Sequence, residues 1–153
     1  MDDRRIRQVR DVSIFGALRP ETIEFLLGRA GRVETRAGEL LVRDKEPGGD
    51  LLVLETGRAE VFKERGSPAT RVRLAELGPG DCIGETSILA IMPRSASVLA
   101  LEDCVALRLR CEDLLALRDY DVEQFSILVL NLGRETARRL WVTNELLLER
   151  MIG

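Results

Sequence analysis

Three residues near the middle of the chain are suited to holding a negatively charged ligand: Gly84, Glu85 and Arg94. A glycine lets the backbone approach a ligand closely, and an arginine donates charge-assisted hydrogen bonds to a phosphate. The amides of Thr86 and Ser87, which open the predicted helical turn that follows, would point at the same negative group. Because Glu85 would repel a phosphate alone, the set indicates a ligand that also carries hydroxyl donors, as a ribose does. The alternative is a tight turn with an incidental surface Glu–Arg pair.

The composition is that of an ordinary globular domain. The 153 residues are 45% hydrophobic and 32% charged, which is enough for one domain with a proper core. The formal charge is −3, from 23 Lys and Arg against 26 Asp and Glu, so no overall basic field would attract nucleic acid. Four arginines make the N-terminus basic: Arg4, Arg5, Arg7 and Arg10. We interpret them as the solvated face of a first helix, with a local binding patch as the alternative.

The chain has no histidine, and its three cysteines show no CxxC spacing: Cys82, Cys104 and Cys111. The absence of histidine excludes Ser-His-Asp and Cys-His catalysis, His-ligated zinc and His-ligated haem. No nucleophile with an adjacent base is present either, so we predict no enzyme activity and no metal. Unpaired cysteines fit a reducing compartment. With no signal peptide and no apolar run near the roughly 20 residues that span a bilayer, we predict a cytoplasmic protein without a membrane partner.

Hydrophobic spacing changes from a helical period to a period near two after residue 32. We expect one helix over 3–12 and a second that begins at Pro20 and stops near Gly31. Glycine and proline turns then separate seven candidate strands: 32–36, 39–43, 50–55, 58–64, 70–77, 95–101 and 104–108. Many short, evenly spaced strands predict an antiparallel barrel. The expected class is α+β, mainly β: an antiparallel β-roll or jelly-roll barrel flanked by N-terminal helices and a long C-terminal helix.

The C-terminal part of the chain is predicted to be helical. A short helix is expected over 110–118, and Asp119 or Asp121 would cap the next one. Residues 122–151 contain no proline and a single glycine, which predicts one long helix. At 1.5 Å per residue it would be about 45 Å long, too long for one barrel to bury.

Two apolar faces are predicted on this long helix. One, formed by Phe125, Leu128 and Leu132, would pack on the barrel. The other follows a heptad seam that suits a second copy of the helix. Its a and d positions are Leu130, Gly133, Ala137, Leu140, Asn144, Leu147 and Met151. The alternative is an amphipathic helix that folds back on its own domain.

Residues 84–87 and 93–98 resemble the phosphate-binding cassette of cyclic nucleotide-binding domains, in which Gly-Glu, a short apolar helix and Pro-Arg-Ser-Ala follow one another. Three turns typical of that family also occur in order: Ala37-Gly38-Glu39, Pro47-Gly48-Gly49-Asp50 and Leu77-Gly78-Pro79-Gly80-Asp81. Lys45 replaces a frequent glycine, and Ala90-Ile91-Met92 replaces a more polar turn. The chain is therefore similar to this family over most of its length.

The resemblance implies roles for the residues of the cassette. Glu85 would hold the ribose 2′-hydroxyl and Arg94 the cyclic phosphate. Leu74 and Ile83 would form apolar walls. Further ligand contacts are expected at Gly84, Thr86, Ser87, Ser95 and Ala96.

Residues 137–145 resemble the dimer helix of the catabolite activator protein branch of this family. There a Thr-Ser pair contacts the base of the nucleotide, the serine coming from the other subunit. Thr143 and Asn144 take those positions here, and the Asn144 amide can both donate and accept. Ser95 leaves cyclic AMP and cyclic GMP open as ligands, whereas the pair on the helix favours cyclic AMP.

The resemblance implies one domain over 1–153, with N-terminal helices (1–31), a β-roll (32–109) that contains the cassette (82–98), and C-terminal helices (110–153). The helix-turn-helix that normally follows in that branch is missing, so direct DNA binding is not expected. The leading hypothesis is a sensor whose C-terminal helix moves when a cyclic nucleotide binds, with output through a homodimer or an unknown effector protein. The alternative is a dimerisation or scaffold module whose pocket holds no nucleotide.

Overall fold

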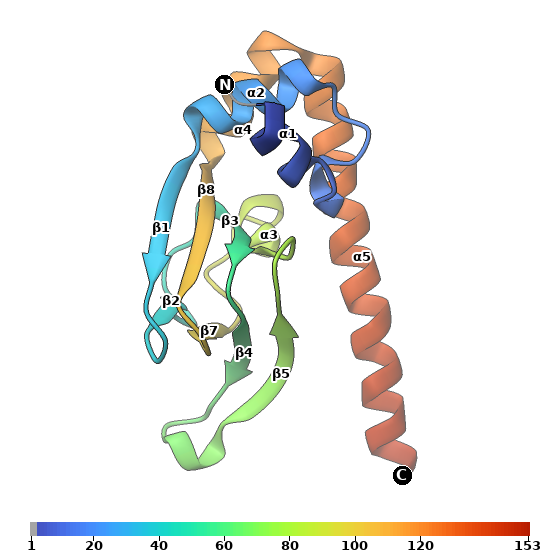
Figure 1. The fold of residues 1–153 in the computed structure, drawn as a ribbon. Coiled ribbons are helices and arrows are strands. Elements are labelled where there is room, and N and C mark those ends of the chain that lie inside the picture. The colour runs from blue at the N-terminus through green and yellow to red at the C-terminus, as the bar shows by residue number, and fades with distance from the viewer. Residues whose placement is uncertain (1–2) are drawn as a thin grey trace.

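The computed structural model describes residues 3–153, so the first two residues of the expected domain lie outside it. Figure 1 shows two layers of strands, a group of helices at one end and one long helix along the side. Both sheets are antiparallel, with the strand orders β1-β8-β3-β6 and β2-β7-β4-β5. The strands are β1 (Gly31–Thr35), β2 (Leu40–Val42), β3 (Asp50–Thr56), β4 (Ala59–Lys63), β5 (Val72–Leu77), β6 (Cys82–Ile83), β7 (Ser97–Ala100) and β8 (Cys104–Arg110). The predicted fold class, α+β with a dominant β-roll, is confirmed.

Strand β3 shows how the sequence builds two cores. Successive side chains of a strand point to opposite faces. Leu51 and Val53 accordingly pack into the core between the first sheet and the helices. Leu52 and Leu54 pack into the core between the two sheets. All four side chains are 3% exposed or less, so this strand is buried on both faces.

The helices lie close to the predicted positions. They are α1 (Asp3–Arg10), α2 (Pro20–Arg29), α3 (Glu85–Leu89), α4 (Cys111–Tyr120) and α5 (Val122–Ile152), with short 3₁₀ helices η1 (Ser13–Phe15) and η2 (Pro68–Thr70). Pro20 opens α2, as expected. Of the two candidate caps for α5, Asp121 is the one used, because its carboxylate accepts a hydrogen bond from the amide of Gln124 at 3.1 Å. Strand β6 was not predicted, since two residues are too few to show a period.

The first half of α5 is fixed to its own domain. Leu128 and Leu132 are fully buried in the helical core, and Phe125 packs against it, as predicted. Asn131 adds two hydrogen bonds across the chain, since its Nδ2 donates to the carbonyl oxygens of Ile14 at 3.0 Å and Gly16 at 2.7 Å. These contacts hold the helix against η1 and α4.

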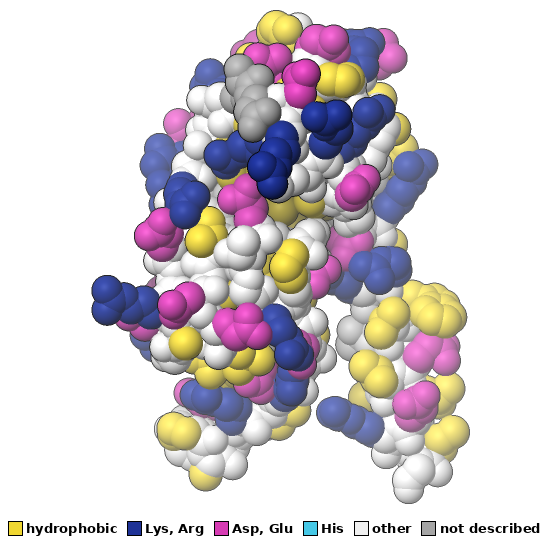
Figure 2. Space-filling view, viewed as in Figure 1, with side chains coloured by type: hydrophobic (Ala, Val, Ile, Leu, Met, Phe, Trp, Pro, Cys, Tyr) yellow, Lys and Arg dark blue, Asp and Glu magenta, His cyan; other side chains and the backbone are white. Residues whose placement is uncertain are grey.

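The second half of α5 is exposed on every side. Figures 1 and 2 show it standing apart from the β-roll, with apolar side chains along its surface. Every residue from Leu140 onward is exposed, and so are all seven predicted seam positions. The exposed large apolar side chains here are Leu140, Trp141, Val142, Leu146, Leu147, Leu148, Met151 and Ile152. Within residues 3–153, no helix has the length and apolarity needed to span a bilayer.

Candidate functional site

Arg94 lies at the centre of the candidate site and is 7% exposed. Its Nη2 forms an ion pair with Asp50 at the start of β3. Its backbone is also fixed, because its amide donates to the carbonyl of Glu46 and its carbonyl accepts from the amide of Lys45, both at 2.9 Å. The other terminal nitrogen, Nη1, is buried and has no hydrogen-bond partner among residues 3–153. A buried donor without a partner is unfavourable, so an anion at Nη1 would be stabilised.

Gly84 is required where it stands for two reasons. Its φ of +100° lies in the left-handed region, which side chains other than hydrogen rarely allow. A Cβ at this position would overlap Nη1 of Arg94 and would come within 2.7 Å of the carbonyl oxygen of Asp50. The glycine therefore lets the turn from β6 into α3 pass directly over the arginine.

Glu85 is buried, at 4% exposure, and forms an ion pair with Arg139 of α5. The same guanidinium donates from Nη2 to the carbonyl oxygen of Cys82 at 2.7 Å. Its Nε lies 3.2 Å from Oε1 of Glu135, one turn earlier on α5. The carboxylate expected to face a ribose is thus engaged by a cation from the C-terminal helix.

This arrangement changes the pKa values of two groups. Burial, with the neighbouring Glu85 carboxylate, raises the pKa of the Cys82 thiol to about 12. Burial alone would lower the pKa of Arg139, but the neighbouring acidic groups, of which the Glu85 carboxylate has the largest effect, together outweigh it and raise that pKa above its ordinary value. At neutral pH the site therefore contains a neutral Cys82 thiol beside a charged Arg139 guanidinium.

A small pocket, with a volume of about 100 Å³, lies between the cassette and Arg139. Eight predicted site residues line it: Ile83, Gly84, Glu85, Thr86, Ser87, Arg94, Ser95 and Ala96. Ligand sites usually have volumes of roughly 300–1,000 Å³. The pocket in this state is therefore too small for a nucleotide, and Arg139 forms part of its wall.

Leu74, expected as an apolar wall, does not line this pocket. On β5, Ala75 pairs with Val61 and Arg73 with Phe62, so the register shifts at Leu74, which has no partner on β4. Its side chain is 48% exposed. Besides Ile83, the apolar lining comes from Val42, Val61, Leu77 and Val98.

Thr143 and Asn144 do not line the pocket of their own chain. Both are exposed on α5, about one turn beyond Arg139. The hydroxyl of Thr143 donates to the carbonyl oxygen of Arg139 at 2.8 Å, a bond within the helix. Contact between these two side chains and a base stays a prediction, because it requires a second copy or movement of α5.

Asp50 and Arg139 are two residues of the site whose roles are not predicted from the sequence. Asp50 ends the Pro47-Gly48-Gly49-Asp50 turn, and Arg139 lies within the 137–145 run, so both were inside recognised motifs. Their contacts join positions 44 and 54 residues apart in the chain. Over residues 3–153, His, Cys, Asp and Glu side chains form no group of three or more that could hold a metal ion.

Comparison with known proteins gives a consistent result. A family model described as the cyclic nucleotide-binding domain matches residues 32–121. The cyclic AMP receptor protein of Thermus thermophilus is 33% identical over 127 residues, which are 83% of this chain and 56% of that protein. The chain thus spans little more than half the length of this curated relative.

Two solved structures extend the comparison. The catabolite activator protein of Thermus thermophilus superposes with a TM-score of 0.77 at 31% identity, covering 91% of this chain and 62% of that one. A cyclic nucleotide-binding domain from Methylobacillus flagellatus gives a TM-score of 0.87 over 99% of this chain and 86% of that one. At 22% identity, the second likeness concerns the fold alone.

Proposed function

Because the chain belongs to the cyclic nucleotide-binding domain family, we propose that it is a sensor module that binds a cyclic mononucleotide, with cyclic AMP preferred. Binding would move α5 and pass a signal to a second copy or an effector protein. The proposed role is recognition and not catalysis, with a cytoplasmic location that fits three free cysteines.

The buried nitrogen Nη1 of Arg94 is the observation that carries this proposal. Asp50 holds the guanidinium in place through Nη2, so the second nitrogen remains available for a cyclic phosphate. The amides of Thr86 and Ser87, which line the same pocket, would donate to the other phosphate oxygens. An arginine already fixed by its own ion pair loses little conformational freedom when it binds.

The ribose end of the pocket, where Glu85 meets Arg139, would provide the coupling to α5. A ribose 2′-hydroxyl that donates to Glu85 competes with Arg139 for the same carboxylate. The nucleotide also needs more than the present 100 Å³, so Arg139 has to leave its place in the wall. A ligand shifts a conformational equilibrium only by binding the two states differently. Here the difference would be the exchange of the Arg139 contact for the ribose contact.

A second copy would complete the site and cover the seam. The predicted a and d positions are all exposed, and the apolar residues around them have no partner within residues 3–153. Pairing two α5 helices would bury these side chains and bring Thr143 and Asn144 toward a nucleotide. The choice of cyclic AMP over cyclic GMP rests on this pair, because Ser95 leaves both ligands open.

Isothermal titration with cyclic AMP and cyclic GMP tests the proposal on the 153-residue chain. We expect heat of binding for cyclic AMP and loss of that heat in Arg94→Ala. Arg108→Ala is the matched control, because Arg108 also approaches Asp50, at 3.9 Å, but does not line the pocket. The sensor function is rejected if millimolar cyclic AMP and cyclic GMP give no heat of binding and do not compete with each other.

A scaffold without a nucleotide is the second candidate. The ion pair between Glu85 and Arg139 in a small pocket is the observation that favours it, because an abandoned site would look the same. Arg139→Gln separates the two functions. It should strengthen nucleotide binding in a working sensor, whereas a scaffold would bind no nucleotide in either form.

A further inference from the structure

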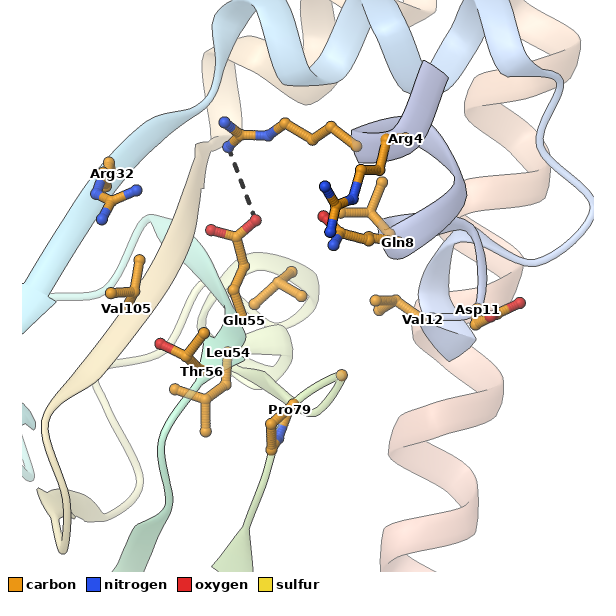
Figure 3. A pocket seen from close by; sticks show the side chains of 14 residues that line it. Arg4, Gln8, Asp11, Val12, Arg32, Leu54, Glu55, Thr56, Pro79 and Val105 are labelled. Carbon is orange, nitrogen blue, oxygen red and sulfur yellow. Dashed lines mark ion pairs between the residues drawn. The ribbon is translucent and has the colours of Figure 1, made fainter. Parts of the chain in front are cut away.

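A second and larger cavity lies between α1 and the outer face of the first sheet (Figure 3). Its volume of about 730 Å³ is within the range of small-molecule sites, roughly 300–1,000 Å³. It shares no lining residue with the candidate nucleotide pocket. The Pro79-Gly80 turn forms one wall and is held to β3 by a hydrogen bond from the amide of Gly80 to the carbonyl oxygen of Leu54, at 2.8 Å.

The floor of this cavity is lined by apolar residues: Val9, Val12, Val53, Leu54, Pro79 and Val105. Val53 and Leu54 of β3 are fully buried, and Val9 and Val12 are 3% and 7% exposed, so these four offer little surface to a ligand. Val105 is half-buried and Pro79 is exposed. An apolar body of moderate size would therefore rest mainly on Val105 and Pro79.

The rim of the cavity is rich in guanidinium groups. Arg4 and Arg5 of α1 and Arg32 of β1 line it. The lining also includes two carboxylates, Glu55 and Asp11. Figure 3 shows Asp11 pointing away from Glu55 and Arg4, which leaves Glu55 as the carboxylate within the cavity. The closest approach of Arg5 to Glu55 is 3.7 Å, and the Arg5 side chain is 44% exposed. Such a long, solvated ion pair contributes little and is readily exchanged.

We propose that this cavity binds a small organic oxyanion, with its apolar body on the floor and its carboxylate or phosphate on Arg5. Guanidinium groups bind planar carboxylates and phosphates through paired charge-assisted hydrogen bonds, which a stretched contact to Glu55 does not supply. Glu55 acts as an internal competitor for the same arginine. The inference is independent of the nucleotide-sensing function, because the two sites have no residue in common.

The test is an amide NMR titration of the full chain with 2-naphthoate, 2-naphthyl phosphate and the neutral 2-naphthalenemethanol. We expect saturable shifts at Val53, Glu55 and Gly80 with either anion, and much weaker ones with the alcohol. The same shifts should persist when cyclic AMP is present at saturation. The two anions distinguish a carboxylate site from a phosphate site. Absence of shifts at millimolar probe, or shifts confined to α5, would overturn the proposal.

Three single variants make the assignment specific. Arg5→Gln should weaken binding of the better anion about tenfold, since a hydrogen bond to a charged group is lost. Glu55→Gln should tighten it, because the competing carboxylate is gone, and unfolding cannot mimic a gain in affinity. Arg7→Gln is the matched control, because it removes the same charge from α1 at a residue that does not line the cavity. Equal loss in the Arg5 and Arg7 variants, or no gain with Glu55→Gln, would refute the site.

Discussion

At the phosphate end of the candidate nucleotide site Arg94 keeps a buried nitrogen that has no partner among residues 3–153, whereas at the ribose end Glu85 is already bound by Arg139. The first end lies within the rigid roll, between the turn that opens α3 and the start of β3. The second depends on a side chain from a helix whose far half, from Leu140 onward, is exposed. A ligand would thus gain affinity at the phosphate end and cause movement at the ribose end.

Replacing Arg94 should have the largest effect on nucleotide affinity. Arg94→Ala removes the buried charged donor, and we expect cyclic AMP affinity to fall by at least about 100-fold, or about 3 kcal/mol. Isothermal titration measures the change, with circular dichroism to verify folding. Glu85→Gln should cost less, because it removes only the ribose contact. If Arg94→Ala and Glu85→Gln lose affinity equally, the proposed difference between the phosphate end and the ribose end of the site is wrong.

Asp50 should matter more for the stability of the ligand-free domain. Asp50→Ala leaves the guanidinium of Arg94 buried without its ion-pair partner, and Asp50 itself is 29% exposed. We expect the free energy of unfolding to fall by about 2 kcal/mol, below the 3–5 kcal/mol of fully buried pairs. Urea unfolding with and without cyclic AMP measures this effect. Bound phosphate should recover part of the loss, and no recovery would argue against a phosphate on Arg94.

The Cys82 thiol, which lies beside Glu85 at the ribose end, should make the free energy of unfolding depend on pH. Its folded-state pKa of about 12 is above the ordinary value of 9.0, so the folded protein retains this proton longer than the unfolded chain does. The resulting stability is fully present below pH 9 and is lost as pH rises toward 12, by about 1.4 kcal/mol for each pH unit. Urea unfolding at pH 8, 9 and 10 should show a larger loss in the wild type than in Cys82→Ala, in which Cys104, whose pKa burial also raises, still contributes. If the free energy of unfolding changes with pH equally in the wild type and in Cys82→Ala, this prediction is wrong.

Arg139 should give the smallest change in affinity and the clearest change in coupling. Arg139→Gln frees Glu85, so cyclic AMP should bind about fivefold more tightly, in keeping with a partly exposed ion pair worth about 1 kcal/mol. Arg138→Gln is the matched control, since Arg138 pairs with Glu135 and not with Glu85. A spin label on α5 beyond Arg139 should move with ligand in the wild type and in the control. Unchanged ligand-induced movement in Arg139→Gln would exclude Arg139 as the coupling residue.

Local patterns predicted most of the fold and the cassette. Turn residues and a change of period located seven of the eight strands, and eight of the eleven predicted site residues line one pocket. Leu74 lies outside this pocket because the register of β5 with β4 shifts at this residue, which a sequence pattern does not show. Asp50 and Arg139 were missed because their roles arise only from contacts between distant parts of the chain. No periodicity in a single sequence records such a contact.

The position of Arg139 along α5 also sets how far a signal would travel. The helix continues beyond this residue to Ile152 as an unbroken rod of 13 residues, about 20 Å at 1.5 Å per residue. If the helix tilts about the last buried contacts near Leu132 and Glu135, its tip moves through a larger arc than Arg139 itself. A tilt of about 10° would displace the tip relative to Arg139 by about 3 Å. If α5 moves in this way, its exposed half would act as a lever arm, and the displacement of its tip would increase with each helical turn added beyond the ion pair.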